Sequence, residues 1–347
     1  LEPARFPQLG LVPGAAAEFE FWRGVAYRRA GILDKAIVCL DRAQQLGWSK
    51  TDVRREKVLV LFQSGRVDQA APQVEELLAE PMDNETAEEV YDCLVLGYLS
   101  EYRLHDARTC MEYWLEWQPH SVAARLRRAE MFGFVEDPKR QEEDLREILK
   151  FAPETVEAHF KLAETLLSQR RVTDALAEYR WCAAREPESG SALLGVGSCL
   201  RQIGNLPEAR RALDAGLKCK LKPTEEAYGL AEQAEIDLVE KKNADALAAL
   251  TRAVELDPHD GKYRYALGSA LSKAGRRDLA ERQIEEWRKL DKHKSRLYDL
   301  EHEIIAHPRD ADLRCEIGVL LREQGLEKES YAWLTSALRC DPNHRGT

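Results

Sequence analysis

Residues 21–31 read FWRGVAYRRAG, and residues 265–275 read YALGSALSKAG. Both stretches begin with an aromatic residue, have glycine fourth, alanine sixth and a large apolar residue seventh, and end on glycine. Because these side chains recur at intervals of three and four residues, they fall on one face of a helix. The last glycine separates this helix from the next one. Each stretch therefore predicts a short amphipathic helix and a turn.

A second helix is predicted after each turn, in DKAIVCLDRA at 34–43 and DLAERQIEEW at 278–287. Prolines then recur: Pro119, Pro153 and Pro187 are spaced by 34 residues, in the phrases WQPHS, FAPET and REPES. The phrases LDPHD and CDPNH belong to the same set. Because proline cannot continue a helix, each one ends a second helix. LDPHDGK at 256–262 is therefore interpreted as a boundary between units rather than as an acid and histidine site.

Small side chains keep the same phase along the chain. One set occupies the eighth position of seven units, with members Gly24, Ala129, Ala163, Gly197, Ala234, Gly268 and Gly318. A second set follows twelve residues later, with members Ala36, Ala175, Ala209, Ala246, Ala280 and Ser330. Small residues allow two helices to cross closely. One such helix pair cannot bury its apolar face alone, so neighbouring pairs must stack.

These motifs resemble the tetratricopeptide repeat family, whose pattern runs W-x2-L-G-x2-Y, then A-x3-F, then P. The resemblance covers about residues 17–344 and implies an all-α, right-handed α-solenoid of about nine helix-turn-helix repeats. Eight repeats fit 17–50, 51–84, 88–121, 122–155, 156–189, 190–223, 227–260 and 261–294, and the ninth fits 311–344. Residues 1–16 form a lead-in segment. Repeat four, with Pro138 and Gln141, and repeat seven, with Asp237, depart from the pattern.

Residues 295–310 break the period. No glycine or proline lies between Gly275 and Pro308, and Leu297, Leu300 and Ile304 continue the apolar stripe of the second helix of repeat eight. We expect that helix to run on to about residue 306, so that about 28 residues span roughly 42 Å. A loop near 291–295 would contradict this. The segment 295–310 is thus a helical extension.

The two ends of the sequence lack features of a finished array. The chain opens at Leu1 without methionine and stops at HRGT, directly after repeat nine. A repeat array needs a polar cap on its last apolar face. We therefore expect either a fragment of a longer protein or a partner that covers the last repeat.

Composition restricts the class of protein. The formal net charge of -10 argues against sequence-independent nucleic-acid binding, which needs a basic face. The eight cysteines include no C-x-x-C pair, so we interpret them as free thiols and expect a cytoplasmic protein. No stretch reaches about 18 apolar residues, so we expect no direct membrane insertion. A periplasmic location, through a membrane segment before Leu1, is the alternative.

Catalytic and cofactor motifs are not evident in the sequence. His302 and His307 are five residues apart and do not share a helix face as metal ligands would. The glycines in GVGSCLRQIG at 195–204 are packing and turn residues of repeat six, and the basic run at 288–296 is a solvated helix face. Trp114 and Trp287 are expected in the core between repeats. The sequence predicts no enzyme, cofactor or metal site.

A partner-binding groove follows from the resemblance. In this family the first helix of each repeat lines a groove through its positions 2, 5, 9 and 12. The residues so placed are Phe21, Arg28, Arg55, Phe62, Asp92, Leu126, Glu130, Phe160, Glu164, Arg201, Tyr228, Glu235, Lys262, Tyr265 and Arg322. Aromatic residues and arginine supply much of the binding energy of protein interfaces. We therefore expect a protein or peptide segment there, and weaker binding after Arg55→Glu or Phe62→Ala.

The function expected is a non-catalytic scaffold for protein–protein interaction, with its oligomeric state open. Phe21 and Val25 stand where relatives that grip chaperone carboxylates have lysine and asparagine, so that activity is not expected. Two alternatives remain at this point. One is a recruiting or regulatory region of a larger enzyme, and the other is a membrane-tethered assembly factor in envelope or cytochrome biogenesis.

Overall fold

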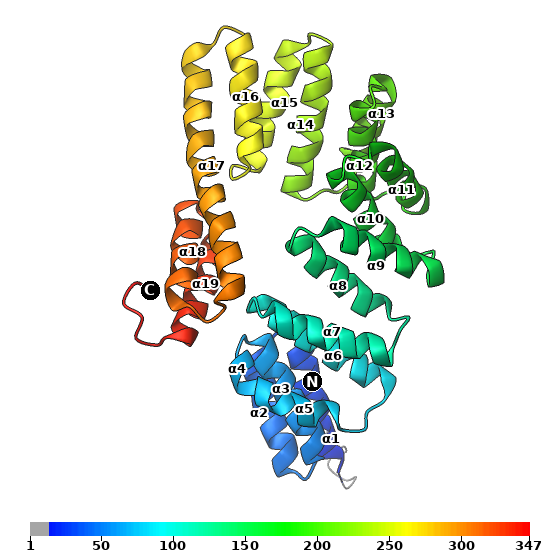
Figure 1. Ribbon diagram of the computed structural model, residues 1–347, viewed down its shortest axis with the longest axis vertical. Helices are drawn as coiled ribbons and strands as arrows, with labels where there is room; N and C mark the ends of the chain where they lie inside the picture. The colour runs from blue at the N-terminus through cyan, green and yellow to red at the C-terminus, as the bar shows by residue number, and fades with distance from the viewer. Residues whose placement is uncertain (1–13) are drawn as a thin grey trace. The chain divides into compact units, whose positions relative to one another are not determined.

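The computed structural model describes residues 14–347, which form helices joined by turns, with no strand in that range (Figure 1). The predicted lead-in, residues 1–16, lies outside the described residues as far as residue 13. The helices come in antiparallel pairs, one pair for each predicted repeat. The all-α solenoid class predicted from the sequence is confirmed.

Helix bounds follow the repeats closely. The first helices of the nine pairs are α1 (Ala15–Arg29), α3 (Lys50–Gln63), α6 (Asn84–Ser100), α8 (Val122–Phe134), α10 (Val156–Ser168), α12 (Gly190–Gln202), α14 (Pro223–Val239), α16 (Gly261–Lys273) and α18 (Ala311–Glu323). The continuous second helices are α2 (Leu33–Gln45), α7 (Leu104–Trp117), α9 (Pro138–Phe151), α11 (Val172–Arg185), α13 (Leu206–Gly216), α15 (Asn243–Leu256), α17 (Arg277–Ala306) and α19 (Glu327–Cys340).

The second helix of repeat two is broken, although the period predicts a continuous one. It consists of α4 (Val67–Ala70), the 3-10 turn η3 (Ala71–Gln73) and α5 (Val74–Leu78). Pro72 lies in η3. Because proline lacks an N–H and clashes with the preceding turn, it interrupts the helix there.

Two compact units divide the chain. The first contains residues up to Ala124 with the short segments Ile305–Arg309 and Arg339–Pro342. The second contains Arg125–Ile304, Asp310–Leu338 and Asn343–Thr347.

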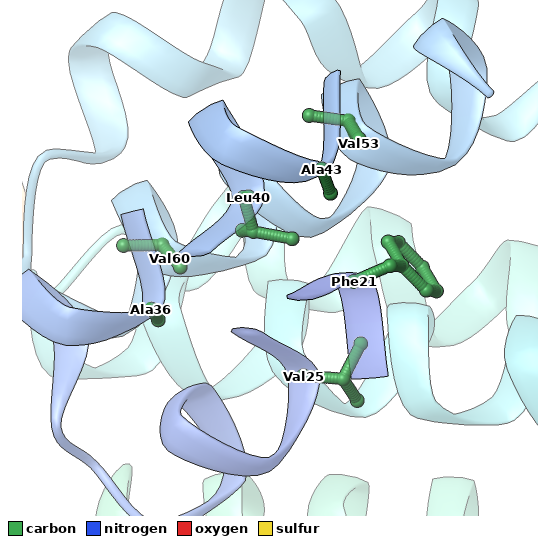
Figure 2. Packing of buried hydrophobic residues seen from close by; sticks show 7 residues of the cluster. All are labelled: Phe21, Val25, Ala36, Leu40, Ala43, Val53 and Val60. Carbon is green, nitrogen blue, oxygen red and sulfur yellow. The ribbon is translucent and has the colours of Figure 1, made fainter. Parts of the chain in front are cut away.

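In the first unit, α1, α2 and α3 enclose an apolar cluster (Figure 2). Leu40 and Ala36 of α2 face α1, where Gly24 leaves room for them: a side chain at Gly24 would meet Leu40 at 2.9 Å. The phenyl ring of Phe21 stacks on Trp48 with ring centroids 5.0 Å apart. The small residue at the eighth position of the repeat therefore sets how closely the two helices pack.

In the second unit, a similar cluster joins α14, α15 and α16. Its buried members are Ala234, Ala246, Leu250, Leu267, Ala270, Leu271 and Ala280. Ala280 comes from the start of α17, so the cluster links repeats seven and eight. Stacking of this kind is expected of repeats that cannot bury their apolar faces alone.

The turns inside the repeats use the left-handed backbone region. Gly275, between α16 and α17, has φ of 75°. Repeats without glycine at this place use Tyr102, Glu136, Arg170 or Lys241 instead, with φ between 55° and 61°. The turn geometry is therefore kept among the repeats of this chain even where the residue best suited to it is missing.

The two repeats that depart from the sequence pattern still form helix pairs. Pro138 is the first residue of α9, where a missing N–H costs nothing, and the Asp137 carboxylate accepts a hydrogen bond from the Arg140 N–H at 3.1 Å. In repeat seven, the buried Asp237 carboxylate pairs with Arg210 at 2.6 Å. Each departure thus has a local partner.

α17 is one helix of 30 residues, as the unbroken stripe predicts. No loop interrupts it near residues 291–295. Leu300 and Ile304, in its second half, are fully buried. At 1.5 Å per residue the helix is about 45 Å long.

Candidate functional site

Three of the predicted groove residues are buried and do not face a partner. The exposed fractions of Phe21, Phe62 and Arg28 are 3%, 1% and 2%. Phe62 packs edge-on against Tyr98, and the close approach of Gly97 covers its ring. The expectation that Phe62→Ala would report on binding is therefore wrong, because that substitution would remove a core side chain. Phe21 is a core residue for the same reason.

Arg28 belongs to an ion-pair network between three first helices of the first unit. Its guanidinium donates to Glu56 of α3 and to Glu89 of α6, both at 2.6 Å. Arg29 also donates to Glu89, at 2.7 and 3.0 Å. A buried arginine that joins α1, α3 and α6 in this way holds the repeats together and is not free for a ligand.

Several other predicted residues are accessible but isolated from one another. Arg55 pairs with Asp52 one turn away, and Asp92 is half-buried. Lys262 and Arg322 are exposed on α16 and α18. Leu126 and Glu130 of α8 are half-buried, and Glu130 accepts a hydrogen bond from Lys161 of α10 at 2.9 Å. These residues do not form one cluster.

Five predicted residues do come together, on α10, α12 and α14. Phe160 packs edge-on against the buried Tyr179 with ring centroids 5.5 Å apart. Glu164 and Tyr228 lie close enough to the same tyrosine to raise its pKa, although burial is the largest cause. Glu235 and Tyr228 likewise act on Arg201. We call the surface formed by Phe160, Glu164, Arg201, Tyr228, Glu232 and Glu235 the α10–α14 face.

An ion pair crosses the middle of the α10–α14 face. Arg201 of α12 donates two hydrogen bonds to Glu232 of α14, at 2.8 and 3.2 Å. Burial acts to lower the pKa of Arg201, but hydrogen bonding and charge attraction from Glu232 raise it, so the guanidinium stays charged. The face thus has three carboxylates and one guanidinium, and that guanidinium is already paired.

Glu164 and Glu235 are the exposed carboxylates of the face. Loss of hydration raises the pKa of Glu164, and the nearby Lys161 only partly offsets this. Lys161 itself is paired with Glu130. A carboxylate that is accessible but poorly hydrated gains from a cation brought by a ligand. The site therefore favours a positively charged ligand.

Tyr228 lies between these charged groups, to which it presents an apolar ring and a polar hydroxyl group. Burial, with a smaller contribution from Glu232, raises its pKa to about 12, although a hydrogen bond with Ser198 opposes the change. The phenol is thus neutral at ordinary pH and can donate or accept a hydrogen bond. An aromatic ring with a polar tip is common in protein-binding surfaces.

Parts of the sequence match models of a known protein family. Tetratricopeptide repeat models match residues 142–181, 160–225 and 238–304. The chain is a tetratricopeptide repeat protein. No curated protein sequence matches the chain significantly.

Solved structures of other proteins match much of this chain. A tetratricopeptide repeat protein from Parabacteroides merdae has a TM-score of 0.51 and 13% identity, over 74% of this chain and 99% of that one. The Cut9–Hcn1 hetero-tetramer of the APC/C gives 0.46 and 14%, over 95% and 74%. YrrB, described as a TPR protein with an unusual peptide-binding site, gives 0.36 and 20%, over 59% and 96%.

One residue of this repeat protein's α10–α14 face was missed by the sequence. Glu232 stands at position 6 of a first helix, outside the four positions considered. Glu232 reaches the face because Arg201 draws its carboxylate across from the next repeat. The spacing of Arg201 and Glu232, 31 residues in a 34-residue period, was the available signal.

The tryptophans and cysteines singled out in the sequence differ in how deeply they are buried. Trp114 is fully buried, as expected, and stacks on Tyr91 with centroids 5.8 Å apart. Trp287 is only half-buried, which the sequence did not predict. All eight cysteines are free thiols, and six of them are buried.

Metal ligation and membrane insertion each need a recognisable arrangement of side chains. Within residues 14–347, no group of three or more histidine, cysteine or acidic side chains is arranged to hold a metal ion. In the same part of the chain, no helix has the length and apolar character needed to cross a membrane.

Proposed function

We propose that this protein is a non-catalytic scaffold that binds a basic segment of a partner protein on the α10–α14 face. The observation that carries the proposal is the pair of exposed carboxylates, Glu164 and Glu235, beside an arginine already neutralised by Glu232. Lysine or arginine side chains of a partner would pair with these carboxylates. Phe160 and Tyr228 would pack against the aliphatic stems of those side chains.

The framework supports this role because the face is built on helices of three consecutive repeats, two of which are joined by an ion pair. Glu164, Arg201 and Glu235 come from three stacked helices, and the ion pair between Arg201 and Glu232 fixes the middle of the face. A surface ordered before binding loses little entropy when a partner arrives. Repeat stacking thus supplies the preorganisation that an extended, flexible peptide lacks.

Peptide titration tests the proposal. Fluorescence anisotropy would compare the affinities of a lysine-rich peptide and a glutamate-rich peptide of equal length for the whole chain. We expect the lysine-rich peptide to bind at least about tenfold more tightly, and Glu164→Gln with Glu235→Gln to remove most of that preference.

The matched control is Glu188→Gln, which changes an exposed carboxylate in the turn before α12 by the same charge. It should leave both affinities unchanged. Equal affinity of the two peptides for the unaltered chain, or equal losses in the control and in the double variant, would contradict a site at the α10–α14 face.

A further inference from the structure

The groove between the two helices of a repeat receives the first helix of the next repeat in the second unit. α12 lies against repeat five, where a side chain at Gly195 would meet the ring of Tyr179 at 2.7 Å. α14 lies against repeat six, where a side chain at Gly229 would meet Leu194 at 2.7 Å and Leu217 at 2.9 Å. These grooves are therefore filled by helices with a small residue at the contact.

Repeat eight does not follow this arrangement. Because α17 continues past the end of the repeat, α18 lies beside its second half (Figure 1). There Arg296 donates to Glu316 of α18 at 2.7 and 2.8 Å. The end of α18 meets the start of α16: a side chain at Gly325 would lie 3.6 Å from His259. Helix α18 thus stands end to end with α16 and does not cover it.

The uncovered groove has a volume of about 820 Å³. Tyr265, Gly268 and Ser269 of α16 form one side, and Ala280 and Ile284 of α17 form the other. Tyr265 is 52% exposed, whereas Leu194, at the same position of repeat six, is 1% exposed. The groove therefore has the frame of an inter-repeat contact without the helix that fills it.

The residue at the twenty-seventh position of each repeat supports this comparison. In repeats two, three and four it is large and is buried between stacked repeats, as Leu77, Trp114 and Ile148. Trp287, at the same position of repeat eight, is half-buried and touches Tyr265 with ring centroids 4.9 Å apart. The contact that buries this position elsewhere is missing where α17 runs on.

Charges at the turn end of the groove indicate the chemistry of an occupant. Lys273 and Arg277 line that end, and neither has an ion pair within residues 14–347. A similar contact occurs in repeat six, where Arg210 of α13 pairs at 3.0 Å with Glu240, just past the end of α14. Repeat eight has Glu281 at the position of Arg210, so the cations of its groove lie about one helical turn nearer the turn end. A docked helix running parallel to α16 would place its last turn beside Lys273 and Arg277.

The rest of the groove limits the occupant further. Glu281 and Glu285 of α17 also line the groove. The middle of an occupant must therefore be neutral or basic. At the other end, beside a second cavity of about 380 Å³, the buried side-chain amide nitrogen of Gln324 has no hydrogen-bond partner in the described chain. An acceptor in the first turn of a docked helix would satisfy it.

We propose that the groove between α16 and α17 is a docking site for an amphipathic helix of a partner protein, with a small residue at its centre and a carboxylate in its last turn. This helix would occupy the place that the next repeat takes elsewhere in the array, in the helix-in-groove mode of recognition. The site is separate from the α10–α14 face and binds a different kind of segment.

The probe for this site is a synthetic, labelled peptide based on residues 223–240 and held helical by a staple on its polar side. Its acidic residues at positions 232, 235 and 237 are replaced by glutamine, because Glu281 and Glu285 line the middle of the groove. We expect it to bind the whole chain in fluorescence anisotropy. Ser269→Trp, which fills the groove, should weaken binding at least about tenfold. Arg277→Glu should weaken it about fivefold, and a peptide with Glu240→Lys should recover that loss.

Two controls keep the result specific. Arg282→Glu reverses an exposed charge of α17 that does not line the groove, and it should leave the affinity within about twofold. Glu164→Gln, on the α10–α14 face, should also have no effect, so the two proposals can fail separately. Absence of saturable binding, or an affinity that Ser269→Trp and Arg277→Glu both leave unchanged, would overturn the proposal.

Discussion

A buried arginine in the first unit joins helices of three repeats through ion pairs. Arg28 was expected to face a partner but is held by Glu56 and Glu89. Burial acts to raise the pKa of Glu89, but hydrogen bonds from Arg29 and Arg28 outweigh it and lower the pKa to about 2. Because the folded pKa lies below the ordinary value of 4.5, the ionised form stabilises the folded state.

The pH dependence of stability tests this network. A carboxylate with a lowered pKa contributes its full stabilisation above its ordinary pKa and loses it as the pH falls through the folded value. The urea midpoint of the first unit should therefore fall between pH 4.5 and about 2 more steeply in the unaltered chain than in Glu89→Gln. Glu88→Gln on the same helix is the control. Identical pH profiles for Glu89→Gln and the unaltered chain would rule out this role.

At the scale of elements, the long helix α17 decides where repeats eight and nine stack. Its first half packs against α16, and its second half carries α18. The turn that would normally end a second helix is absent, so the last repeat is displaced along the helix axis. Continuity of α17 is thus the cause of both the open groove and the half-exposed Trp287.

Lys292→Pro tests the continuity of α17. Lys292 is exposed in the middle of the helix, so the substitution changes the backbone and little else. We expect a loss of about 3 kcal/mol in the free energy of unfolding, because proline removes a hydrogen bond and clashes with the preceding turn. Urea denaturation would measure it, with Lys292→Ala as a nearly neutral control. A proline variant as stable as the alanine variant would mean that α17 is already broken there.

Sequence periodicity predicted most of these elements, for identifiable reasons. The absence of glycine and proline between Gly275 and Pro308 was enough to predict the long helix. The same reasoning missed the break at Pro72, because the 34-residue period was followed in preference to the local residue. The exposure of a side chain could not be predicted from its position, because the burial of Phe62 depends on how closely Gly97 of α6, the first helix of the next repeat, approaches it.

At the scale of the whole molecule, the protein is an array in which each repeat contributes only a few side chains to any surface. Position alone suggested fifteen binding residues, and five of them form the α10–α14 face. The others are buried, paired or isolated on separate helices. The family pattern therefore pointed to five residues that lie together on one surface, but the charge balance of that surface depends on contacts between repeats that the pattern does not contain.

Reversal of the charge preference tests whether a basic segment binds at the α10–α14 face. The affinities of the lysine-rich and glutamate-rich peptides would be measured for the chain carrying Glu164→Lys and Glu235→Lys together, with Glu188→Lys as control. If a basic segment binds at the α10–α14 face, the double variant should prefer the glutamate-rich peptide, while the control keeps the preference of the unaltered chain. A double variant that still prefers the lysine-rich peptide by the original factor would exclude binding at this face.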